Sequence, residues 1–73
     1  MSRQRNTINR TVRVEDVELH VAATEHGKGH WDAVARFDLN GQLCRAQLGE
    51  PAPNSDCAIE EVARIAIRSI RNG

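Results

Sequence analysis

Aromatic residues are scarce in this chain, which has one tryptophan, Trp31, one phenylalanine, Phe37, and no tyrosine. It also lacks an apolar run long enough to span a bilayer, and its N-terminus lacks one that would act as a signal peptide. A chain of 73 residues forms one domain. A domain of this size buries only ~60% of its unfolded surface. We therefore expect a small cytoplasmic domain with no membrane contact and a thin core, in which Trp31 and Phe37 supply much of the large apolar volume.

Cysteine is sparse, and the net charge is low. Cys44 and Cys57 are the two cysteines, and nothing near either marks a reactive thiol, so we expect free thiols in a reducing compartment. The formal net charge is zero, which by itself neither favours nor excludes a nucleic-acid partner. The charge is unevenly distributed, however, because residues 1–14 contain no acid and four arginines: Arg3, Arg5, Arg10 and Arg13.

Catalytic and metal-binding patterns are missing. No serine or cysteine has a histidine base nearby in the sequence, and the carboxylates are scattered along the chain. His26 and His30 are four residues apart, but Gly27 and Gly29 favour a turn over a helix that would align them. We therefore predict neither an enzyme nor a cofactor or metal site.

Residues 31–48 carry the clearest structural signal, two short strands joined at Asn40-Gly41. Asn-Gly between alternating apolar residues is typical of a tight hairpin because both residues tolerate positive φ. Two registers fit. A two-residue loop places Phe37 opposite Cys44 and Arg36 opposite Arg45, whereas a type I turn with a bulge at Gly41 shifts the pairing by one residue. The first register separates apolar from charged side chains better and is preferred.

The preceding segment is β-rich, but its apolar alternation changes phase at Glu15-Asp16. A bulge or a short turn at this point explains the change. We expect a dependable strand over residues 17–24. Residues 1–16 are predicted to be a basic, flexible arm with a short strand at 11–14, which extends the next strand or pairs with another chain.

The C-terminal segment predicts one helix over residues 56–71, after a connector broken by Pro51 and Pro53. Its apolar residues recur at helical spacing and form a wide stripe that needs a sheet face to cover. The predicted fold is therefore α+β. It is a three-stranded antiparallel meander with one C-terminal helix packed on one face (β-β-β-α), and residues 17–73 form the single domain.

This order of elements resembles many short bacterial proteins built as a meander, a loop and a helix that begins near Glu-Glu-x-Ala. The likeness covers residues 17–71 and implies no particular function.

A narrower likeness involves three segments, residues 29–36 (Gly-His-Trp-Asp-Ala-Val-Ala-Arg), 45–49 (Arg-Ala-Gln-Leu-Gly) and 60–64 (Glu-Glu-Val-Ala-Arg). They are similar to the DNA-binding domain of plant ethylene-response factors, and related three-stranded modules begin some phage and transposon integrases. In those domains the open sheet face enters the major groove. The resemblance implies DNA contacts for Trp31, Arg36 and Arg45. The chain departs from the family at Gln47, which replaces its second tryptophan, and before Trp31, where the family's arginines are missing.

Two functional hypotheses follow from these features. The first is an interaction module with a protein partner, which forms a homodimer through its open sheet face or an edge strand. The second is nucleic-acid binding by the open face and the basic arm, with Arg3, Arg5, Arg10, Arg13, Trp31, Arg36 and Arg45 as contact residues. The first is preferred because the chain is neutral and acids lie near the candidate face. Exposed arginines clear of Asp32 and Asp38 would favour the second.

Overall fold

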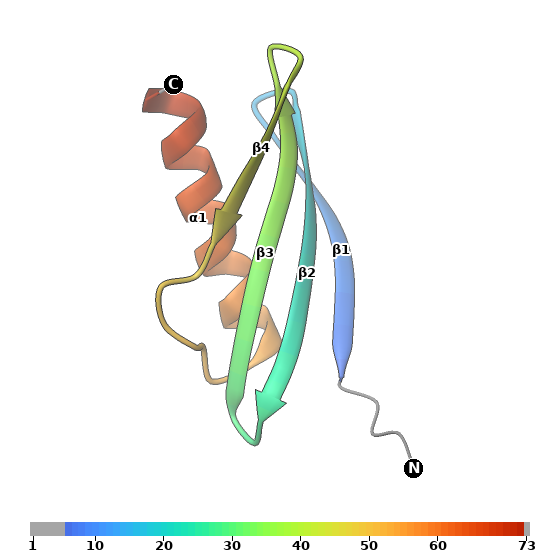
Figure 1. Cartoon of the computed structure of the whole chain (residues 1–73), viewed down its shortest axis with the longest axis vertical. Helices are drawn as coiled ribbons and strands as arrows, with labels where there is room; N and C mark the ends of the chain where they lie inside the picture. Colours follow the sequence, from blue (N-terminus) through green and yellow to red (C-terminus); the bar gives the residue numbers. More distant parts are fainter. Residues whose placement is uncertain (1–5, 73) are drawn as a thin grey trace.

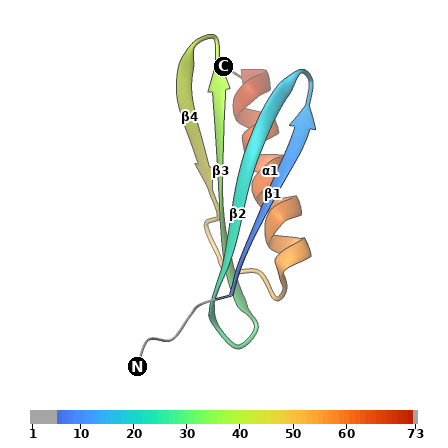
Figure 2. The same ribbon diagram turned by 90° about the vertical axis from the view of Figure 1, so that its right-hand side faces the viewer.

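The computed structural model describes residues 6–72, which form four strands and one helix. The strands make one antiparallel sheet in the order β1-β2-β3-β4, and the helix follows. Their bounds are β1 Thr7–Val14, β2 Val17–Gly27, β3 His30–Leu39, β4 Gln42–Gln47 and α1 Ser55–Asn72. Figures 1 and 2 show α1 lying along one side of a long, twisted sheet. The predicted α+β class and the antiparallel meander with a C-terminal helix are confirmed, whereas the predicted number of three strands is wrong.

The additional strand is β1, which begins at Thr7 instead of covering only residues 11–14. It pairs antiparallel with β2 from Thr7 opposite Thr24 to Val14 opposite Val17. The phase change in the sequence is therefore a two-residue turn at Glu15 and Asp16. The first strand does not extend the second but folds back along it.

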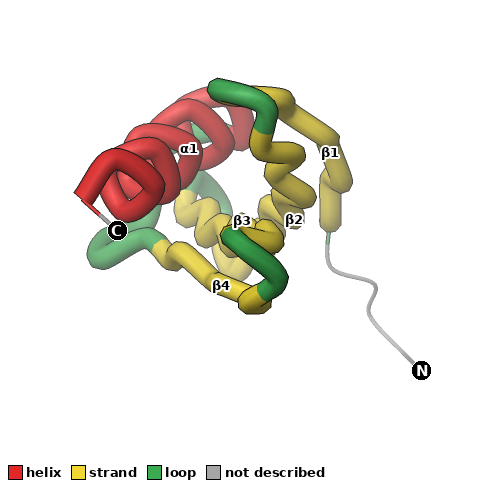
Figure 3. Tube along the Cα trace, turned by 90° about the horizontal axis from the view of Figure 1, so that it is seen from above, coloured by secondary structure: helices red, strands yellow, loops and turns green. Residues whose placement is uncertain are grey.

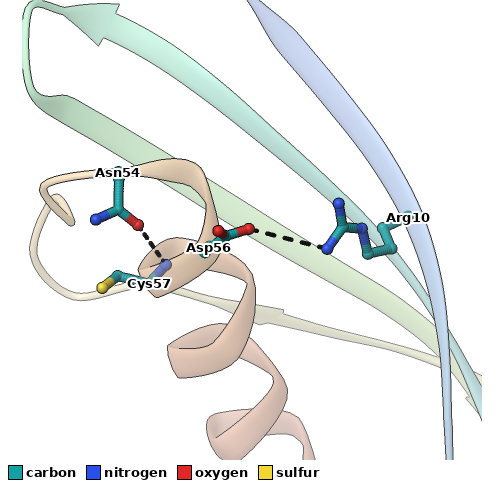
Figure 4. Close-up of polar contacts among 4 residues, drawn as sticks. All are labelled: Arg10, Asn54, Asp56 and Cys57. Atoms are coloured by element: carbon teal, nitrogen blue, oxygen red, sulfur yellow. Dashed lines mark hydrogen bonds and ion pairs between the residues drawn. The ribbon is translucent and has the colours of Figure 1, made fainter.

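Arg10 explains why β1 was missed in the sequence. It interrupts the alternation of Ile8, Val12 and Val14, which are half-buried on the helix side of the sheet. Its guanidinium reaches over the edge of the sheet to Asp56 in the first turn of α1, at 3.9 Å (Figure 4). Arg10 therefore breaks the apolar alternation that would otherwise have predicted the regular strand β1.

The hairpin between β3 and β4 has the preferred register. Phe37 lies opposite Cys44 and Arg36 opposite Arg45. Asn40 and Gly41 both have positive φ, 54° and 79°, as the two-residue turn requires. One face of the hairpin is therefore apolar and the other is charged.

The core lies between α1 and the sheet and consists largely of small residues. Phe37, Leu19, Val21 and Val62 are its largest fully buried side chains. The other buried residues are Ala23, Ala33, Ala35, Ala46, Ala52, Ala58, Ile59 and Ala66. Alanines on facing surfaces let the helix approach the sheet closely, and Figure 3 shows the sheet curving around α1. The helix packs mainly on β2 and β3 and least on β1, so β1 is the least covered strand.

Local contacts fix where α1 begins and how the connector lies. The Asn54 Oδ1 accepts a hydrogen bond from the backbone N–H of Cys57 at 2.8 Å, which caps the helix (Figure 4). Trp31 and Ala52 exchange two backbone hydrogen bonds of 2.8 Å, which tie the connector to the start of β3. These contacts hold the helix on one face of the sheet and leave the other face open.

Candidate functional site: the open face of the sheet

The face of the sheet that α1 does not cover is called the open face here. Side chains alternate between the two faces of a strand, and the buried residues of β2 and β3 have odd numbers, so the even-numbered residues point away from the helix. The register assigns the open face to Thr7, Asn9, Thr11 and Arg13 of β1, Glu18, His20, Ala22 and Thr24 of β2, His30, Asp32, Val34, Arg36 and Asp38 of β3, and Leu43, Arg45 and Gln47 of β4.

A row of basic residues crosses this face. His20 lies opposite Arg36, and Arg36 lies opposite Arg45 on the next strand. All three side chains are exposed, and neither arginine forms an ion pair within residues 6–72. Like charges directly opposite each other destabilise a sheet by a few tenths of a kcal/mol to ~1 kcal/mol. The two arginines are therefore available to an anionic group from outside the domain.

Two of the three acids of the open face, Glu18 and Asp32, have other partners. The Glu18 carboxylate lies 3.2 Å from the His20 Nε2 and 3.9 Å from a guanidinium nitrogen of Arg13. The Asp32 carboxylate lies 3.1 Å from the His26 Nε2. Asp32 therefore pairs with His26 and not with the arginines of the basic row.

The centre of the open face is small and apolar. Ala22 and Val34 lie opposite each other on β2 and β3, and both are half-buried although no element within residues 6–72 covers them. They lie in an open hollow of about 420 Å³, with Asn9, His20 and Arg36 among the residues on its sides. The exposed face thus has an apolar floor with polar and charged walls.

The structure brings only some of the predicted contact residues together. Arg13, Arg36 and Arg45 lie on the open face. Arg3 and Arg5 lie outside the described residues.

Arg10 and Trp31 lie on the helix side of the sheet. Arg10 pairs with Asp56, and Trp31 packs half-buried against the edge of the core beside Ala52. Neither residue belongs to the surface that carries the exposed arginines. The structure therefore does not bring these two residues together with Arg13, Arg36 and Arg45, and their predicted contact with nucleic acid stays a prediction.

Sequence reasoning did not identify His20, Ala22 and Val34 as parts of this surface. The sequence did contain a signal, because each of the three alternates with buried residues along its own strand, and the two strands are neighbours. Without the register between the strands, however, they could not be placed in one patch.

The cysteines, the metal-ligating side chains and the helix of residues 6–72 give no further candidate site. Cys44 is half-buried and Cys57 exposed, and both are free thiols. Within residues 6–72, no three side chains of His, Cys, Asp or Glu gather closely enough to hold a metal ion. In the same part of the chain, no helix combines the length and apolarity needed to cross a membrane.

Comparison of the chain with protein-family models, with curated proteins and with solved structures finds no match.

Proposed function

We propose that this chain is an interaction module that docks a second copy of itself through the open face. The observation that carries the proposal is the apolar centre at Ala22 and Val34, which is uncovered within residues 6–72. Leu43, at one end of the same face, is 78% exposed. Apolar surface at the middle of a polar patch is the usual anatomy of a protein interface.

The charges of the open face also favour a protein partner. Its three arginines are balanced by three acids: Arg13, Arg36 and Arg45 against Glu18, Asp32 and Asp38. A phosphate backbone would be attracted to the arginines but repelled by the acids. A surface that carries both positive and negative charges suits a partner that carries both as well. A second copy of the chain is such a partner.

The size of the face sets the expected affinity. Four strands ~4.8 Å apart and about eight residues long at ~3.3 Å each give roughly 500 Å² per copy. Two such faces bury roughly 1,000 Å², near the lower limit for a specific interface. We therefore expect a weak dimer with a dissociation constant in the micromolar range.

Sedimentation velocity over a wide concentration range tests the proposal. The expected result is a reversible shift from monomer to dimer as concentration rises. Ala22→Gln places a long polar side chain in the hollow and should abolish the shift. Ala63→Gln, a change at a half-buried alanine of α1, is the matched control and should preserve it. A monomer at ~1 mM, well above the micromolar range, would overturn the proposal.

Nucleic-acid binding is the second candidate, and the unpaired, adjacent Arg36 and Arg45 favour it. One phosphate can accept hydrogen bonds from two guanidinium groups. Fluorescence anisotropy of a labelled random duplex at low and at near-physiological salt tests this candidate. Binding that falls steeply with salt, and that Arg36→Ala and Arg45→Ala weaken to a similar extent, would support it. The absence of binding at low salt would exclude it.

A further inference from the structure

The open-face residues of β3 have a self-complementary order of charge. In chain order they are His30, Asp32, Val34, Arg36 and Asp38, here called the β3 strip. Val34 lies at its centre, with an acid two residues before it and a base two residues after it. The outer positions have the reverse order, with a base, His30, four residues before Val34 and an acid, Asp38, four residues after it. An antiparallel copy of the strip therefore places opposite charges against each other.

We infer that two copies dock with β3 antiparallel over β3, about a two-fold axis that passes through Val34 across the strands. This inference rests on the proposed function and adds the orientation and register of the partner. In a two-fold interface a contact from residue i to residue j recurs from j to i. The axis places Arg36 over the partner's Asp32, Asp32 over the partner's Arg36, and Val34 over its own copy.

The outer positions of the strip obey the same symmetry. His30 lies four residues before Val34 and Asp38 four residues after it, so His30 of one copy meets Asp38 of the other. Both side chains are exposed, and neither forms an ion pair within residues 6–72. The strip therefore offers two symmetry-related ion pairs, Arg36 with Asp32, and two symmetry-related contacts between His30 and Asp38, around an apolar centre.

Charge also disfavours the other simple orientation. A two-fold axis parallel to the strands, between β2 and β3, would bring Asp38 over Glu18 of the partner and Arg36 over His20 of the partner. Like charges brought together at an interface strongly suppress an association. The axis across the strands avoids both contacts.

The strands that flank the strip tolerate the same axis. Asn9 and Gln47 lie in the same row as Val34, on β1 and β4. A side-chain amide has both donors and an acceptor, so it can pair with its own copy. Ala22, also in this row, is small enough to leave room for the His20 side chain to reach Thr24 of the partner.

Charge reversal tests this register. Arg36→Asp should weaken dimerisation at least ~10-fold, because it sets two acids against each other at two symmetry-related positions. Asp32→Arg should do the same by opposing two arginines. A mixture of these two variants should form a heterodimer, since each then supplies the charge that the other needs. The double variant Asp32→Arg/Arg36→Asp should dimerise like the unmodified chain.

Arg68→Asp is the matched control. It reverses an exposed arginine of α1, which lies on the opposite side of the sheet from the open face, and should leave the dimer within ~3-fold of its original affinity. Circular dichroism checks that each variant is folded, and heterodimer formation shows it independently. A dimer that both single reversals leave intact overturns this register but not the proposed function. A chain that is monomeric throughout overturns both, and equal loss of duplex binding in Arg36→Ala and Arg45→Ala would indicate nucleic acid instead.

Discussion

The two edge hairpins of the sheet turn through the same number of residues with different residue types. Asn40 and Gly41 connect β3 to β4 with φ of 54° and 79°, and Glu15 and Asp16 connect β1 to β2 with φ of 49° and 67°. Asparagine and glycine adopt positive φ readily, whereas glutamate rarely does. The first turn is therefore dictated by its own sequence, and the second is imposed by the structure around it.

Contacts outside the turn hold the β1–β2 hairpin in place. The Arg71 Nε near the end of α1 donates a hydrogen bond to the Glu15 carboxylate at 3.3 Å. Val12 and Val14 pack half-buried beside the core. A turn with unfavourable residues can therefore form when its strands and its side chains find partners elsewhere.

The largest contrast between the hairpins is expected in the core. Phe37→Ala in β3 should lower the free energy of unfolding by ~3–5 kcal/mol, because Phe37 is only 2% exposed. Val12→Ala in β1 should lower it by about 1 kcal/mol, because Val12 is half-buried. Urea denaturation followed by the fluorescence of Trp31 measures both.

Arg36→Ala, next to Phe37 but on the open face, is the control for this experiment and should change stability by at most ~0.5 kcal/mol. Equal losses for Phe37→Ala and Val12→Ala would show that the two hairpins contribute alike to the core and would contradict the comparison.

The fold could be predicted from the sequence wherever local signals agreed. Asn40-Gly41 predicted the hairpin and its register, and the spacing of apolar residues predicted α1 to within one residue at each end. β1 could not be predicted in full, because Arg10 breaks its alternation and its turn lacks asparagine and glycine. Only its pairing with β2, a tertiary contact, makes that segment a strand.

The candidate site could be predicted only in part. The sequence identified Arg36 and Arg45 as neighbours because they belong to the hairpin with the clear signal. It did not separate Arg10 and Trp31 from them, since the face of a side chain depends on the phase of each strand. The charge order of the β3 strip became meaningful only once α1 was seen to cover the opposite face.

Gly41→Ala tests how far the second hairpin depends on its turn. Alanine at a φ of +79° should lower the free energy of unfolding by about 1–2 kcal/mol. Gly49→Ala is the control, because no positive φ or close neighbour constrains that position, and we expect a change of at most ~0.5 kcal/mol. If the two variants were equally stable, the turn residue would not be what fixes the hairpin.

Asp16→Gly tests the opposite case, a turn whose residues oppose its geometry. Glycine at a φ of 67° should raise the free energy of unfolding by roughly 0.5–1 kcal/mol, because it relieves the strain of the left-handed conformation. Asp16→Ala, which removes the carboxylate without relieving the backbone, should lower it instead. Thermal and urea denaturation compare the three chains, and a gain from alanine equal to that from glycine would attribute the effect to charge.

The smallest effect is expected at the contact between the turn and the helix. Arg71→Ala should lower the free energy of unfolding by at most ~0.5 kcal/mol, because the Arg71 and Glu15 side chains are 67% and 49% exposed and water screens their attraction. A double-mutant cycle with Glu15→Ala isolates the pair, and Arg68→Ala controls for the loss of a basic residue from the same helix. A coupling energy well above ~1 kcal/mol, larger than exposed pairs usually supply, would mean that this contact holds the turn. A coupling near zero would leave the pairing of β1 with β2, and the packing of Val12 and Val14, as the forces that impose positive φ on Glu15 and Asp16.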